Sequence, residues 1–542
     1  MDSFFILLIK YYLLLIFLLF FGRSFIVIYS KFFLNKMSDE IDIHGINIYV
    51  LYPFVGLFIL GNLLFLINFF LPLKSNFSYL VLLFLLINIY EKINLNYFIK
   101  YMKYSSLSLF LLVSSYNVNF HYDAGLYHLN NQLWLRESNI VQGFSNIYGA
   151  FGVSSIHEYI SAFFWFDQSF ILLHFINLIF IGSLYSFLIF ALLISKENII
   201  KSSAFFVLIY SLLDNFGISG GRNGFISIQS VGKQDVPIAI LFFITSIFIL
   251  ASLINKKYSE EEVIIYSIFS LFLYQLKVSG VTISFLYLIY IFYFFKSKNH
   301  NVNKKIKTLA SFFLLFVLWI LKSIFQTGCL VFPLARTCFS SLAWVDKKYL
   351  KTIEEVTVEY SFSYDFKSSF FEWFQQYITI TPNYVILLNF FFSLIALLLL
   401  KFIFFKASKP ENRNLIIVSY ILFNIIFYLR FGPDSRYLMG TQLLIVAIIG
   451  LYSSFKYSFN DRFIMSLIII SIFLVPRLDS YRSFDLLSNP KISLPVQEME
   501  TLHGRLFPNE GDQCWANINC SANKSDYKIE KIGLFNRVNI NN

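Results

Sequence analysis

A polar stretch that follows an apolar segment carries the residues best suited to chemistry. It reads His121-Tyr122-Asp123-Ala124-Gly125-Leu126-Tyr127-His128, with Glu137 further along. A carboxylate at the boundary between water and an apolar medium is partly desolvated, which raises its pKa toward the range of a general base. We therefore expect Asp123, His128 and Glu137 to be catalytic, with His128 pairing with Asp123 or with a phosphate. The alternatives are a helix N-cap for Asp123 and a histidine in an aromatic belt for His128.

The residues after Asp123 can form a helix over 124–138. On this helix Tyr127, Asn131, Trp134 and Ser138 recur at i, i+4, i+7 and i+11, which places them on one face. We expect this stripe to line a polar cleft, in which Tyr127 and Trp134 bind the substrate.

The segment 214–237 is rich in glycine and ends in Lys233, Asp235 and Pro237. Its glycines allow the backbone to approach a ligand closely, although glycines more often make turns. Lys233 is a candidate phosphate ligand. Asp235 is a second candidate for substrate binding, and its alternative is a cap at the helix start that Pro237 indicates.

Three further cations stand at the ends of apolar segments. Lys277 lies between two such segments, and Arg430 and Arg436 flank a tight turn between two others. A lysine at the depth of a membrane is costly and is a functional candidate. Two guanidinium groups on one turn could clamp a phosphate or a pyrophosphate. The alternatives are a hairpin from which Lys277 reaches the surface, and a simple ion pair between Arg436 and Asp434.

The segments around these residues are strongly apolar. Of the 542 residues, 57% are hydrophobic, 20% aromatic and only 14% charged, whereas soluble domains have about 25% charged residues. The apolar blocks are about 15 to 25 residues long, which suits a helix that crosses roughly 30 Å of hydrocarbon. Polar and apolar residues do not alternate in them, so only helices can satisfy the backbone in lipid. The sequence predicts an all-α integral membrane protein, a polytopic bundle of about fourteen transmembrane helices.

The predicted helices lie near 4–28, 47–70, 78–90, 104–116, 169–193, 199–213, 236–254, 261–276, 278–295, 308–325, 384–405, 415–429, 440–455 and 462–475. The first apolar run is too long for the core of a cleaved signal peptide and is expected to be a membrane helix.

Basic residues sort the loops into two sides. Lysines and arginines gather near 92–103, 256–257, 296–307, 406–413 and 456–462, loops that the helix order puts on one side. This side is expected to be cytoplasmic, and the net charge of +11 then reflects topology rather than nucleic-acid binding. The transmembrane domain is residues 1–475. The external side receives its loops 117–168, 214–235, 326–383 and 430–439, and the C-terminal tail 476–542.

All four cysteines, Cys329, Cys338, Cys514 and Cys520, fall in segments assigned to the outside. Two nearby pairs in an oxidising compartment suggest the disulfides Cys329–Cys338 and Cys514–Cys520. Other pairings are open, because four cysteines allow three connectivities. Zinc binding is disfavoured, since the spacing is not that of paired CxxC ligands and no histidine stands close by in sequence.

The arrangement resembles the GT-C superfamily of membrane glycosyltransferases. The string YDAGLYH at 122–128, with Trp134 and Glu137 after it, is most similar to a group of uncharacterised bacterial multi-pass membrane proteins. That group is expected to share a D-x-G-L-Y-H string, a TGC-x-x-x-P loop, an R-x-x-P-D-x-R-Y-like turn and a tail with Cys-Trp. Here these are found at 123–128, 327–333, 430–437 and 514–515.

The resemblance implies a GT-C-like helical fold and transfer of a sugar from a polyprenyl-phosphate donor to a glycan, lipid or protein acceptor. The reaction would take place on the external face of a bacterial inner membrane, with membrane lipid around the chain. Asp123 would hold the catalytic acidic position, the donor phosphate would lie near the external cations, and Tyr127 and Trp134 would stack on sugar faces. No cofactor is expected, apart from a divalent metal that Asp123 could hold.

Two other functions fit the same compartment. A surface-polysaccharide polymerase or ligase would use similar lipid-linked substrates and would depend more on external arginine and histidine than on Asp123. A lipid-linked oligosaccharide flippase or a solute transporter would need charged residues deep in several helices, where the sequence offers little beyond Lys277 and Lys322.

Overall fold

The computed structural model describes residues 4–33, 37–153, 155–166, 170–217, 228, 230–297, 302–360, 363–380, 383–407, 414–432, 434–451, 453–456, 459–488, 490, 492–502, 505–518, 520 and 527–540. Most of the glycine-rich segment that follows Gly217, and Pro433 in the arginine turn, lie outside the described residues.

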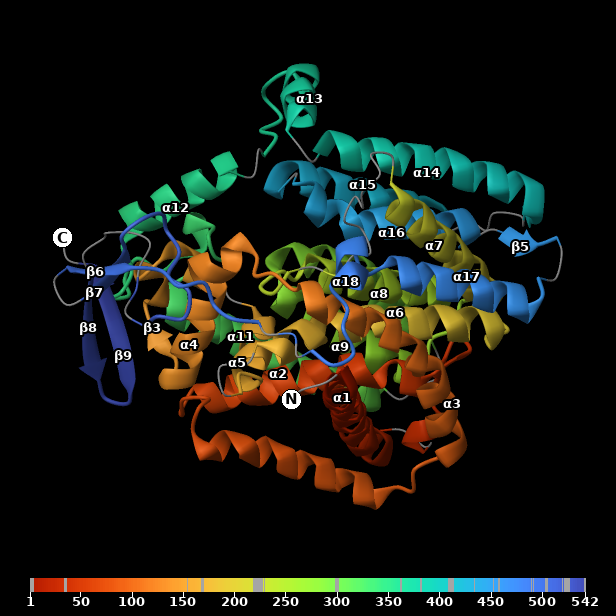
Figure 1. Ribbon diagram of the computed structural model, residues 1–542, viewed down its shortest axis with the longest axis horizontal. Helices are drawn as coiled ribbons and strands as arrows, with labels where there is room; N and C mark the ends of the chain where they lie inside the picture. The colour runs from red at the N-terminus through yellow and green to blue at the C-terminus, as the bar shows by residue number, and fades with distance from the viewer. Residues whose placement is uncertain are drawn as a thin grey trace.

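Long helices make up most of the described chain (Figure 1). They are α1 (Phe4–Phe33), α2 (Tyr52–Asn68), η3 (Asn76–Tyr90), α3 (Leu95–Ser105), η4 (Ser106–Asn117), α6 (Ile171–Leu193), α7 (Asn198–Phe216), α8 (Asp235–Asn255), α9 (Glu260–Leu276), α10 (Ile283–Lys296), α11 (Val302–Thr327), α14 (Asn383–Phe404), α15 (Asn414–Phe431), α16 (Met439–Leu451) and α17 (Asp461–Leu474).

Shorter helices and small sheets lie between and after them. The helices are η1 (Ser38–Glu40), η2 (Ile48–Val50), η5 (Ala124–His128), α4 (Leu129–Glu137), η6 (Phe144–Asn146), η7 (Gly149–Gly152), α5 (Ile156–Phe163), η8 (Val278–Thr282), η9 (Ala335–Thr337), α12 (Lys347–Tyr360), α13 (Phe370–Thr379), η10 (Ser435–Leu438) and α18 (Leu478–Arg482). The strands are β1 (Asp42–Ile43), β2 (Ile46–Asn47), β3 (Val141–Gln142), β4 (Phe405–Ala407), β5 (Ser453–Phe455), β6 (Met499–Leu502), β7 (Arg505–Pro508), β8 (Tyr527–Ile532) and β9 (Phe535–Ile540).

The predicted apolar segments coincide with these long helices. Eight of the described helices are long and apolar enough to cross a membrane, and three apolar helices, including α2 and η3, are shorter. The chain therefore has the helical architecture of a membrane protein, whereas the predicted number of fourteen crossings is not confirmed.

Loops assigned to the same side by their charge lie together in space. The strands β4 and β5 pair residues 405–407 with 453–455, and His44 contacts Ser252 next to the loop that follows α8. At the other end, β3 pairs with β9 of the tail, and the Leu73 amide donates to the Leu135 carbonyl. In Figure 1 β5 and α3 lie at the right end, and α4 and β6–β9 lie at the left end. The left end, which contains α4 and β6–β9, is called the site end below.

The helices α1 and α2 pack backbone against backbone. A Cβ added to Gly22 would lie 2.1 Å from the carbonyl oxygen of Tyr52, and one added to Gly56 would lie 2.0 Å from that of Leu18. Small residues at such crossings let helices approach where apolar burial gives no driving force in lipid. Arg23, beside this crossing, is fully buried, with its Nε 2.8 Å from Oδ1 of Asp39.

The two ends should face opposite compartments, and accessibility labelling can check this. All four native cysteines are in disulfides, so a maleimide would report only introduced thiols. We expect a membrane-impermeant maleimide to label Lys351→Cys at the site end of intact spheroplasts, and to label Lys257→Cys only after permeabilisation. Both side chains are well exposed. Labelling of position 257 in intact spheroplasts would reverse the predicted orientation.

Candidate functional site

Two segments far apart in sequence form the frame of the site. The amide of His121 donates to the carbonyl of Val231 at 3.0 Å, and the amide of Val231 donates to the carbonyl of Asn119 at 3.1 Å. The next residue, Gly232, has φ +96°, and a Cβ there would lie 2.8 Å from that of Ala124. Only glycine suits this backbone conformation and this close approach. The frame brings Lys233 beside Asp123.

Asp123 is an ion-pair partner and not a helix cap. Its Oδ2 lies 2.7 Å from Nζ of Lys233 and 3.9 Å from Nη1 of Arg436. Its side chain caps no backbone amide, and the chain continues from it into the single π-helical turn η5. Such turns are frequent at functional sites. The N-cap alternative is therefore wrong.

The predicted rise in the pKa of Asp123 is also wrong. Burial does raise the pKa of this carboxyl, but Lys233 and the histidines His121 and His128 outweigh burial and hold the pKa below its ordinary value. Asp123 is therefore ionised at neutral pH and is a weak proton acceptor.

His121 is neutral beside this carboxylate. Burial and the charge of Lys233 lower the pKa of its imidazole to about 4. Its Nδ1 accepts the amide hydrogen of Asp123 at 3.0 Å, so the approach of Nδ1 to Oδ2 of Asp123 is not a charged pair. His121 fixes the backbone at Asp123.

A second and a third ion pair lie next to the first. Lys277 Nζ is 3.0 Å from Oδ1 of Asp235 and 3.7 Å from the ring centre of Tyr437. Burial lowers the pKa of Lys277, but the opposing effect of Asp235 and Tyr437 is larger. The net pKa is therefore above its ordinary value and the lysine stays charged. Arg436 Nε donates to Oδ2 of Asp434 at 2.6 Å. Asp235 is the first residue of α8, where the alternative was a helix cap. Its buried side chain instead pairs with Lys277. The predicted Arg436–Asp434 pair is confirmed.

These pairs surround one cavity of about 400 Å³ at the site end. The cavity contains seven of the ten residues predicted for catalysis or substrate binding. Its lining includes Asp123, Tyr127, His128, Ser155, Lys233, Gln234, Asp235, Val356, Thr357, Asp434, Arg436, Lys277 and Tyr437.

A narrow, mostly apolar groove with a volume of about 50 Å³ adjoins this cavity. The two share Asp235, Lys277, Arg436 and Tyr437, which form the boundary between them. The groove is walled by α8, η8, α15 and α16, and its apolar lining includes Ile238, Ala239, Phe242, Phe427, Tyr428 and Phe431. A cavity lined by charged side chains thus passes into a mostly apolar groove at three charged side chains and the Tyr437 ring.

His128 has a buried acidic partner that the sequence analysis missed. Its Nδ1 bonds to Oε1 of Glu158 on α5, and the other oxygen of Glu158 accepts from Gln132 at 2.7 Å. Gln234 donates to the same carboxylate at 3.1 Å. Burial raises the pKa of Glu158, but His128 outweighs it and lowers the net pKa, so the carboxylate is ionised. A glutamate inside the apolar run Ile156–Phe163 was the available signal.

Three predicted residues do not reach the cavity. Oε1 of Glu137 lies 2.9 Å from Nζ of Lys74 at the surface, and Glu137 does not line the cavity. Trp134 is buried in a separate cluster with Phe144 and others, so it offers no free face to a sugar. Arg430, on the last turn of α15, lies against the ring of Phe431 and is not part of the lining. Tyr127 packs against the same cluster but also lines the cavity, so only this end of the predicted stripe reaches the cavity.

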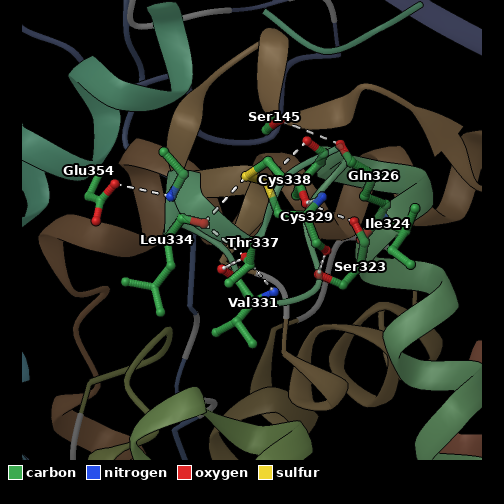
Figure 2. Close-up of a disulfide and its surroundings, with 12 residues drawn as sticks. Ser145, Ser323, Ile324, Gln326, Cys329, Val331, Leu334, Thr337, Cys338 and Glu354 are labelled. Atoms are coloured by element: carbon green, nitrogen blue, oxygen red, sulfur yellow. Dashed lines mark hydrogen bonds between the residues drawn. A yellow bond between two sulfur atoms is a disulfide. The ribbon is translucent and has the colours of Figure 1, made fainter. Parts of the chain in front are cut away.

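Both predicted disulfides are confirmed. Figure 2 shows the loop closed by Cys329–Cys338, with Ser145 and Glu354 beside it. Ser145 donates to the carbonyl of Gln326, and Glu354 of α12 accepts the amide of Ala335 at 3.0 Å. This loop therefore joins the end of α11 to α12, which contributes to the cavity wall.

The Cys514–Cys520 loop of the tail clamps the π turn. The amides of Cys514 and Trp515 both donate to the carbonyl of Gly125 at 2.8 Å, and Asn130 donates to the carbonyl of Asn517 at 2.7 Å. A Cβ at Gly125 would lie 2.8 Å from the Trp515 ring, which explains the glycine there. The tail thus holds the segment that carries Asp123.

Removing this disulfide should loosen the π turn. A cross-link over so short a loop is worth about 2 kcal/mol, so we expect Cys514→Ser/Cys520→Ser to increase hydrogen exchange at residues 125–129. The matched control is Cys329→Ser/Cys338→Ser, which should increase exchange around η9 and leave residues 125–129 protected. Unchanged exchange in the tail variant would contradict the clamp.

The cavity does not suit a divalent metal. Among the described residues no group of three or more His, Cys, Asp or Glu side chains is placed to hold one. The carboxylates of Asp123, Asp235 and Asp434 are each engaged by a cation. This donor set therefore does not fit a divalent cation.

The comparisons with known proteins give the family. Residues 4–443 match the family model described as a domain of unknown function (DUF8201). No similar curated protein and no similar solved structure was found. Because the match covers most of the 542 residues, the chain belongs to the DUF8201 family.

Proposed function

We propose that this protein is a membrane glycosyltransferase that moves a sugar from a polyprenyl-phosphate donor to an acceptor on the external face of a bacterial inner membrane. The observation that carries the proposal is the boundary formed by Asp235, Lys277, Arg436 and Tyr437, at which the charged cavity meets the mostly apolar groove. A donor of this class has the same order of parts, because its apolar chain ends in a phosphate that bears a sugar.

The phosphate would bind at the boundary. Arg436 and Lys277 face both spaces, and Lys233 adds a third cation to the cavity. Guanidinium and ammonium groups form charge-assisted bonds to phosphate oxygens, and Arg can do so in bidentate fashion. Each cation is balanced by an aspartate in the free protein. Donor phosphate would therefore compete with those aspartates.

The prenyl chain would lie in the groove. Phe242, Phe427 and Phe431 present aromatic surface there, and α15 has an exposed apolar outer face in Leu422 and Ile426. A chain that reaches the groove past α15 would bury its first units against these rings. Each Å² of apolar surface that the chain buries would contribute about 25 cal/mol to the binding free energy.

Asp123 would act on the sugar. The anomeric carbon gains positive charge as its bond to phosphate breaks. Asp123 is ionised and lines the cavity but not the groove, so its carboxylate could stabilise this charge. Tyr127 is the aromatic residue available to stack on the sugar.

The proposal is tested by transfer in vitro. Purified protein would be incubated with labelled polyprenyl monophosphate and diphosphate sugars and with lipid and glycan acceptors. We expect a protein-dependent covalent product and release of the polyprenyl carrier, and the size of the product would separate single transfer from polymerisation or ligation. Movement of lipid-linked sugar across vesicle membranes without any covalent product would replace the enzyme with a transporter.

A further inference from the structure

The pair formed by His128 and Glu158 has the geometry of a general base with an orienting carboxylate. We propose that Nε2 of His128, held in place by Glu158, takes the proton from the acceptor hydroxyl during transfer. This inference rests on the proposed function and names the proton acceptor of that reaction.

Glu158 is held by groups that can only donate to it. Gln132 and Gln234 each contribute an amide N–H to the carboxylate, and Ser155 donates to the amide oxygen of Gln234 at 2.7 Å, which fixes the orientation of that amide. Glu158 is 3% exposed, so no solvent replaces these bonds. The hydrogen between Glu158 and Nδ1 of His128 is therefore the imidazole's own.

This arrangement selects one tautomer of His128. With Nδ1 protonated, Nε2 carries a lone pair in the neutral ring. His128 lines the cavity and Glu158 does not, so Nε2 is the ring nitrogen left to face the substrate. No partner for Nε2 is found among the described residues. The buried carboxylate would stabilise the imidazolium that forms on proton transfer, as in a catalytic triad.

Asp123 is the weaker candidate for this step. Nζ of Lys233 lies 2.7 Å from its Oδ2, and Nη1 of Arg436 lies 3.9 Å from the same oxygen. Its depressed pKa makes proton uptake unfavourable near neutral pH. The two acidic residues thus have separate tasks, charge stabilisation for Asp123 and orientation of the base for Glu158.

In this step the acceptor oxygen forms a bond to the anomeric carbon while its proton moves to Nε2 of His128. The bond from that carbon to the phosphate oxygen breaks, and its electron pair leaves with the polyprenyl phosphate. The imidazolium then returns its proton to the departing phosphate or to water.

Other titratable groups surround this pair. His157 on α5 and Lys322 on α11 interact electrostatically with Glu158, and burial lowers the pKa of His157 to about 4, so it is neutral. The groups on the cavity side are His121, Asp123, Lys233, Asp235, Lys277, Asp434 and Arg436. Replacing Glu158 also removes its charge from His157 and Lys322, but neither of these lines the cavity, so a shift in the pH profile of transfer is assigned to His128, which does.

The experiment compares pH–rate profiles for transfer by the purified wild type, Glu158→Gln and His128→Ala. A base must be deprotonated, so the rate rises with pH through its titration. Loss of the Glu158 charge destabilises the imidazolium. We expect Glu158→Gln to shift the acid limb to lower pH and to reduce the plateau rate about 10-fold. His128→Ala should lose about 100-fold, the low end for general base catalysis, and added imidazole should restore part of it.

Glu372→Gln, on the exposed face of α13, is the matched control and should keep the wild-type profile. An unchanged acid limb in Glu158→Gln, or His128→Ala activity within 3-fold of wild type, would overturn the inference. If His128→Ala fails to fold, the acid limb of Glu158→Gln decides alone, since that change preserves shape. Wild-type protein that transfers no sugar would instead refute the proposed function and the base assignment together, and so is distinguishable from failure of the base alone.

Discussion

Transfer by the Asp123→Asn variant is expected to be about 1,000-fold slower than by the wild type at saturating donor. The amide keeps the shape of the side chain but removes the negative charge that would oppose the positive anomeric carbon. Loss of one preorganised electrostatic contact costs about 10²–10³ in kcat. Lys233, 2.7 Å away, would also lose its partner and would add repulsion at the same place.

The matched control for this prediction is Asp479→Asn, the same change on a largely exposed side chain of α18. It should transfer at the wild-type rate. The measurement is kcat with purified proteins of equal monodispersity. A rate for Asp123→Asn within 3-fold of wild type would remove the carboxylate from the chemistry.

Arg436→Ala is expected to weaken donor binding about 100-fold, seen as a rise in KM with a smaller change in kcat. Truncating one partner of a charged contact costs about 2–5 kcal/mol in binding, and a factor of 100 corresponds to about 2.7 kcal/mol. The fold should survive, because the partner left behind, Asp434, has a 32% exposed side chain that water can solvate.

Lys277 offers a useful contrast to Arg436. Its partner Asp235 has a side chain only 4% exposed, and a buried charge left unpaired is strongly destabilising. Removing Lys277 would therefore confuse binding with folding, whereas Arg436 separates them. The matched control is Arg482→Ala, whose side chain is 78% exposed on α18. An unchanged KM for Arg436→Ala would place the phosphate elsewhere.

The helical architecture could be predicted from the sequence because each membrane helix is a local feature. Length, apolar composition and flanking lysines are read within a single segment. The same holds for the disulfides, since each joins cysteines fewer than ten residues apart. The positions of Asp123, Lys277 and Arg436 at segment ends also marked them as candidates.

The partners within the site could not be predicted in the same way. Asp123 and Lys233 are 110 residues apart, and nothing local in either segment indicates the other. The N-cap alternative for Asp123 was wrong because the carboxylate pairs with the distant cation Lys233 rather than with a backbone amide. Trp134 was misplaced because Tyr527 and Val538, about 400 residues later in the chain, help to bury its ring in an apolar cluster. Glu158 was missed because its apolar neighbours resembled a buried core segment.

The central claim is that one amphipathic lipid phosphate spans the groove and the cavity, and photo-crosslinking tests it most directly. The probe would be a polyprenyl phosphate with a diazirine in its first isoprene units, and adducts would be mapped by mass spectrometry. We predict adducts on the groove segments 238–242 and 424–431 that excess polyprenyl phosphate prevents and that Arg436→Ala reduces. Adducts spread over the outer faces of α1 and α14, insensitive to competitor, would contradict the account.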